Sequence, residues 1–98
     1  MTEELLSGVN MPLDPDIRVY ARLQDEYLTA LSRHVSTSEE MDQAYDHPSQ
    51  LPHELWALKL RYNQKGRELC TRYCPDWVLD AEAAVRRTEE AIRQIEGG

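Results

Sequence analysis

The 98-residue chain has 41% hydrophobic and 30% charged residues, a composition typical of one folded domain rather than of a disordered chain. Its formal net charge of −7 disfavours direct binding to nucleic acid and favours solubility or a basic partner. The apolar runs are shorter than the ~20 residues that cross a bilayer, and the N-terminus is acidic, so we expect a soluble, cytoplasmic protein without a membrane partner.

Residues 1–14 are predicted to form a loose N-terminal arm, followed by a single helical domain over residues 15–98. Gly8, Asn10 and Pro12 interrupt any regular period in the arm. We therefore expect it to lie across the domain without regular structure of its own. Leu5, Leu6, Val9, Met11 and Leu13 of this arm are apolar.

A helix start signal comes next. Asp14 can cap a helix with Pro15 in its first position, and Asp16 is favoured there by the helix dipole. The apolar spacing predicts a first helix from about Pro15 to Val35, with an inner face wide enough for two neighbours. That face consists of Tyr20, Leu23, Tyr27 and Leu31, flanked by Ile17, Leu28 and Ala30.

A short second helix is predicted from about Glu39 to Tyr45. Either Ser36 with Glu39 or Thr37 with Glu40 has the spacing of a capping box. A turn-rich linker over residues 46–50 follows. Ser49 can then cap a third helix, which carries Pro52 in its first turn and runs to about Tyr73.

The chain is predicted to reverse at Pro75, which lacks an N–H and disfavours the α conformation at Cys74. An unbroken helix would bring Asp80 and Arg87 onto the apolar stripe of the third helix. A fourth helix should begin near Pro75 and end before the terminal glycines. The predicted fold is therefore all-α, an antiparallel bundle of three long helices and one short connecting helix.

The third helix has two apolar faces. The stripe centred on Leu58 and Leu69 is expected to build the hairpin with the fourth helix. The opposite face needs a cover, either from the first helix, the short helix or the arm, or from another protein. If another protein covers this opposite face, the face is the candidate partner-binding surface, made of Trp56, Leu60, Asn63 and Arg67.

Cys70 and Cys74 stand one helical turn apart. Without a second pair or further ligands they are expected to be structural thiols in a reducing cytosol, although a disulfide, metal or redox role stays open. The three histidines lack ligand spacing. No catalytic triad, phosphate loop or H-E-x-x-H motif occurs, so we expect neither enzymatic activity nor a cofactor or bound metal.

These observations favour a small non-enzymatic protein that binds another protein as a regulator, adaptor or inhibitor, with a homodimer included among the expected assemblies. The basic stripe of Arg61, Lys65 and Arg72 is expected to pair with the acidic fourth helix across the hairpin. An alternative is an acidic mimic of nucleic acid that inhibits a DNA- or RNA-handling protein. Its phosphate-like groups would be Glu39, Glu40, Asp42, Asp80, Glu82, Glu89 and Glu90.

Overall fold

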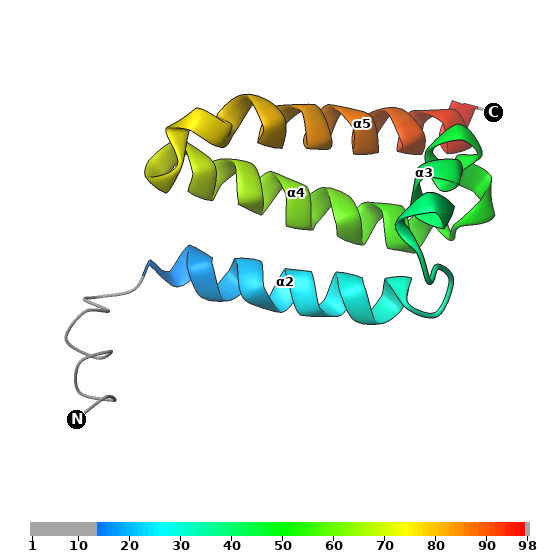
Figure 1. Ribbon diagram of the computed structural model, residues 1–98, viewed down its shortest axis with the longest axis horizontal. Coiled ribbons are helices and arrows are strands. Elements are labelled where there is room, and N and C mark those ends of the chain that lie inside the picture. The colour runs from blue at the N-terminus through cyan, green and yellow to red at the C-terminus, as the bar shows by residue number, and fades with distance from the viewer. Residues whose placement is uncertain (1–13, 98) are drawn as a thin grey trace.

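The computed structural model describes residues 14–97, and that part of the chain is an all-α bundle without strands (Figure 1). The predicted architecture of three long helices and one short helix is confirmed. The predicted arm, apart from Asp14, lies outside the described residues. The elements are α2 (Pro15–Leu31), α3 (Ser38–Asp46), the 3-10 turn η1 (Pro48–Gln50), α4 (His53–Tyr73), the 3-10 turn η2 (Pro75–Trp77) and α5 (Val78–Gly97).

The helices begin largely where the capping residues predict. The Asp14 carboxylate accepts a hydrogen bond from the Asp16 backbone N–H at 2.9 Å. At α3 the capping box uses Thr37 and Glu40, since each side chain accepts from the other residue's backbone N–H, at 3.1 and 3.0 Å.

Two helix bounds differ from the prediction. α2 ends at Leu31 rather than Val35, because the backbone tightens into i→i+3 hydrogen bonds from Arg33 to Ala30 and from His34 to Leu31. α4 begins at His53 after an extended Pro52, without a side-chain cap, and Ser49 belongs instead to η1.

The predicted reversal at Pro75 is confirmed. Cys74 leaves the helix with φ −138° and ψ 59°, and the Trp77 N–H donates to the Cys74 carbonyl at 2.8 Å to form η2. α5 then runs back antiparallel along α4 (Figure 1).

Each of the two faces of α4 has a neighbouring helix within the chain, but the predicted assignment of the faces was wrong. The stripe of Leu58 and Leu69 is continued by Tyr62, which lies against α2, where its ring stacks on Tyr20 with centroids 5.0 Å apart. The hairpin partner α5 lies on the opposite face, where the Asn63 amide donates to Thr88 Oγ1 at 2.8 Å. Helical periodicity defines two faces but does not specify which neighbour covers each of them.

Trp56 is the largest fully buried side chain in the described residues, with 1% of its surface exposed. Its indole N–H donates to the Pro48 carbonyl at 2.8 Å, and its ring lies 5.3 Å from that of Tyr45. η1 and α3 therefore enclose Trp56, so the cover from within the chain is the one found, and the alternative in which Trp56 belongs to a partner-binding surface is wrong.

α3 covers only one end of the bundle. Its nine residues span ~14 Å, whereas the 21 residues of α4 span ~32 Å. α3 lies at the end where α4 begins and α5 finishes (Figure 1). At the other end, beside the Pro75 turn, no helix of the described chain covers the space between α2 and α5.

Candidate functional site: an apolar groove beside the Pro75 turn

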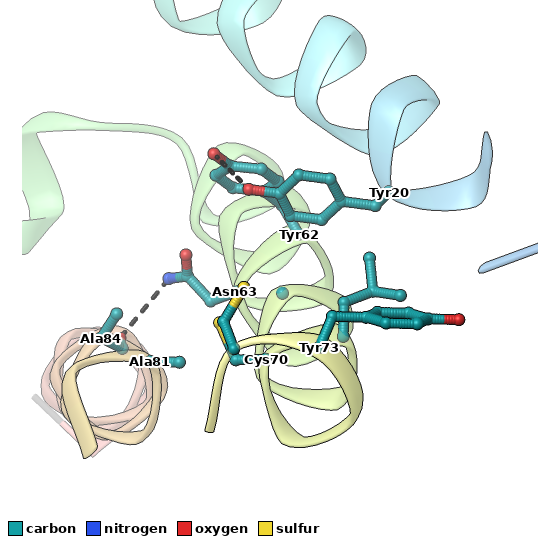
Figure 2. A pocket seen from close by; sticks show the side chains of 10 residues that line it. Tyr20, Tyr62, Asn63, Cys70, Tyr73, Ala81 and Ala84 are labelled. Atoms are coloured by element: carbon teal, nitrogen blue, oxygen red, sulfur yellow. Dashed lines mark hydrogen bonds between the residues drawn. The ribbon is translucent and has the colours of Figure 1, made fainter. Parts of the chain in front are cut away.

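An open groove of about 390 Å³ occupies this uncovered end (Figure 2). Residues of α2, α4 and α5 surround it, together with Cys74, the first residue after α4. Its lining is mainly apolar: Tyr20, Tyr62, Asn63, Gly66, Leu69, Cys70, Tyr73, Cys74, Ala81 and Ala84.

The wall formed by α2 depends on the glycine at position 66. A Cβ atom there would lie 3.2 Å from Cε1 of Tyr20, so the missing side chain lets this ring pack closely against α4. The Tyr20 hydroxyl donates to the Tyr62 hydroxyl at 3.2 Å. Burial raises the pKa of Tyr20 well above its usual range, so this wall is uncharged at neutral pH.

On the α5 side of the groove, side-chain hydrogen bonds connect α4 to α5. Thr88 is fully buried, and its hydroxyl donates to the Ala84 carbonyl at 2.9 Å while accepting from Asn63. Asn63 therefore lines the groove, but its amide nitrogen is directed to α5. Of the other predicted partner-binding residues, Leu60 and Arg67 are half-buried and, like Trp56, are not part of the groove lining.

The two cysteines line the groove as free thiols, with Cys70 half-buried and Cys74 exposed. Burial, and secondarily the neighbouring Cys74, raise the pKa of Cys70, so its thiolate is disfavoured near neutral pH. Within residues 14–97 no cluster of three or more His, Cys, Asp or Glu side chains could hold a metal ion.

Large apolar side chains are exposed at the same end of the molecule. Tyr73, which lines the groove, is 56% exposed, while Trp77 and Leu79 are 63% and 76% exposed. The sequence analysis missed this surface, although it contained a signal. Two aromatic residues flank Pro75, and Leu79 lies outside the apolar stripe of its helix.

Ion pairs fix the start of α2 beside the groove. Arg72 pairs with both Asp14 and Asp16, and the Tyr73 hydroxyl donates to the Asp14 carboxylate at 2.9 Å. The Asp16 N–H, followed by Tyr73 and Arg72, lowers the pKa of Asp14. Lys65 also pairs with Asp16, at 3.3 Å. The predicted pairing of Lys65 and Arg72 with the fourth helix is therefore wrong.

The residues of the predicted acidic surface do not form one stripe. Asp80 and Glu82 project from different sides of α5, because two residues turn a helix by about 200°. Glu40 is used in the capping box of α3, and Glu90 pairs with Arg93 at 2.6 Å. Glu39 and Asp42 are exposed on α3, and Glu89 is partly exposed on α5.

No helix within residues 14–97 has the length and apolar character needed to cross a membrane. Comparison of the whole chain with protein-family models, curated proteins and solved structures finds no match.

Proposed function

We propose that this protein acts by binding another protein in the groove beside Pro75, as a regulator, adaptor or inhibitor. One observation carries the proposal: an open apolar groove includes the exposed Tyr73 in its lining, at the end of the bundle where Trp77 and Leu79 are also exposed. Aromatic residues are enriched in protein interfaces, and binding energy concentrates where an apolar anchor fills a pocket. Exposed apolar patches and grooves often mark sites where a protein binds a partner.

The chemical groups of the groove favour binding over catalysis. They are phenols, one amide and thiols, and the shifted pKa values of Tyr20 and Cys70 keep these two side chains protonated at neutral pH. Acid–base catalysis needs a group whose pKa lies near the working pH. We therefore propose a non-enzymatic role in which burial of apolar surface supplies the affinity.

The dimensions of the groove suit a small number of side chains. Its volume of about 390 Å³ lies at the lower end of the ~300–1,000 Å³ that is usual for ligand pockets. A partner helix could place anchors with i, i+3 or i+4 spacing there, as amphipathic helices do in other apolar grooves.

A matched pair of variants tests this proposal. Ala84→Leu fills the groove, whereas Ala83→Leu makes the same change at an exposed position of the same helix. In affinity capture from native extract, wild type and Ala83→Leu should retain the same protein, and Ala84→Leu should retain about tenfold less, a loss of ~1.4 kcal/mol of binding energy.

The salt dependence of this capture separates the two candidate functions. An apolar contact should persist when ionic strength rises, whereas an acidic mimic of nucleic acid should lose its partner steeply. Equal capture by the Ala84 and Ala83 variants, or capture that disappears at high salt, would contradict a role for the groove.

A homodimer is the special case in which the partner is a second copy. Sedimentation of the wild type at micromolar concentration would then give a dimer that Ala84→Leu dissociates and Ala83→Leu does not. A monomeric wild type would leave a different protein as the partner.

A further inference from the structure

We propose that residues 1–13 of this same chain occupy the groove when no partner is present, so that a partner must displace them. This inference concerns the regulation of the groove, and its biological meaning rests on the proposed function.

The first argument is the place where the segment joins the fold. Asp14 is held at the edge of the groove, because its carboxylate accepts from the hydroxyl of Tyr73, a groove residue, and pairs with Arg72. The start of α2 and the Pro75 turn lie at the same end of the bundle (Figure 1). Residues 1–13 are therefore tethered beside the open end of the groove.

The second argument is reach. A chain of 13 residues can span at most ~45 Å. The groove follows α4 from Asn63 to Tyr73, which is ~15 Å of helix. The segment is long enough to follow the whole groove from its tether, and the short linkage gives it a high effective concentration there.

The third argument is chemical complementarity. Between positions 5 and 13 the segment supplies five large apolar side chains for a mainly apolar lining: Leu5, Leu6, Val9, Met11 and Leu13. At the other end of the bundle, the chain covers α4 with its own apolar side chains, since the ring of Tyr45 in α3 packs on Trp56. Residues 1–13 would provide the corresponding cover for the end that α3 does not reach.

The groove thiol Cys70 offers a direct readout that needs no partner. In the 98-residue chain with Cys74→Ser, Cys70 is the single thiol, and its rate of reaction with a bulky maleimide reports access to the groove. Adding Leu5→Ser and Leu6→Ser should increase this rate about tenfold, because the open state becomes more populated.

The matched control is Leu28→Ser in the same single-thiol chain. Leu28 is an exposed leucine of α2 outside the groove lining, and its replacement should leave the labelling rate unchanged. Circular dichroism should be the same for all three proteins, and the thermal midpoint of the Leu5/Leu6 variant should fall by no more than ~4–8 °C, the shift expected when a tenfold loss of segment binding removes about 1.4 kcal/mol. This result separates release of the segment from general unfolding.

Equal labelling rates with and without Leu5 and Leu6 would overturn the inference. A rate that rises on dilution would overturn it as well, since a second copy would then be the occupant. Either failure would leave the proposed function intact, because that proposal is tested separately by Ala84→Leu. A concentration-independent rate that increases only in the Leu5/Leu6 variant supports the inference.

Discussion

Trp56→Ala is expected to lower the free energy of unfolding by about 3–5 kcal/mol, the usual range for truncating a large buried aromatic residue. Trp56 is enclosed by its own chain, and its indole N–H satisfies the Pro48 carbonyl. Truncation would leave a cavity and remove one of the two hydrogen bonds that the Pro48 carbonyl accepts; the other comes from the Leu51 N–H at 3.2 Å. Because domains of this size are stable by only ~5–15 kcal/mol, much of the total would be lost.

The second tryptophan supplies the control for this experiment. Trp77 is 63% exposed, so Trp77→Ala should change the free energy of unfolding by less than about 1 kcal/mol. Urea unfolding followed by circular dichroism measures both variants. If Trp56→Ala instead left stability intact and dissociated a dimer, Trp56 would belong to an interface between molecules.

The helices and their order were predictable because their signals are local. Asp14, Thr37 and Pro75 each act on neighbouring backbone groups, and the structure uses all three as the sequence indicates. The two apolar faces of α4 were equally readable from the helical period. The helices that pack on these two faces could not be predicted in this way, because the path of the chain between helices determines which helix covers which face.

The enclosure of Trp56 shows the same limit. The side chain of Trp56 is covered by a three-residue 3-10 turn whose Pro48 carbonyl accepts a hydrogen bond from the indole N–H. The periodic spacing of apolar residues does not predict such a turn. One wall of the groove, where Tyr20 packs against Gly66, could have been predicted from the sequence. Glycine inside a helix costs about 1 kcal/mol relative to alanine, so Gly66 could have indicated a close approach by another ring, here Tyr20.

Lys59 leads to a prediction about pH. Its ammonium group is partly buried, donates to the Tyr27 hydroxyl at 2.9 Å, and lies over the rings of Tyr27 and Tyr45 at 4.6 and 5.8 Å. Within residues 14–97 its amine has no carboxylate partner among the ion pairs. Burial, and secondarily the charge of Arg87, lower the pKa of Lys59 from 10.5 to about 8.

The direction of the pH effect follows from this lowered pKa. Between pH 8 and 10.5 the unfolded chain binds more protons at Lys59 than the folded chain, so stability rises with pH. We expect a gain of about 1 kcal/mol between pH 7 and pH 9 in urea unfolding. The raised pKa of Cys70 begins to oppose the gain near pH 9, and the raised pKa values of Tyr20 and Tyr27 oppose it near pH 10, since these groups ionise more readily in the unfolded chain.

Lys59→Met isolates the contribution of this amine. Replacing a poorly compensated buried charge with an apolar side chain of similar length should raise the free energy of unfolding at pH 7 by about 1–3 kcal/mol. It should also remove most of the rise between pH 7 and 9. Lys65→Met is the matched control: Lys65 is paired with Asp16 and Glu68, so its replacement should not stabilise the fold.

An unchanged pH slope in Lys59→Met would assign the titration to another group. A loss of stability in that variant would mean that the hydrogen bond to Tyr27 and the contacts with the two rings outweigh the cost of burying the charge. The predicted outcome, a more stable and less pH-dependent protein, would mean that the end of the bundle covered by α3 tolerates an unfavourable charge. It can do so because Trp56 and the side chains around it supply enough apolar burial to offset that charge.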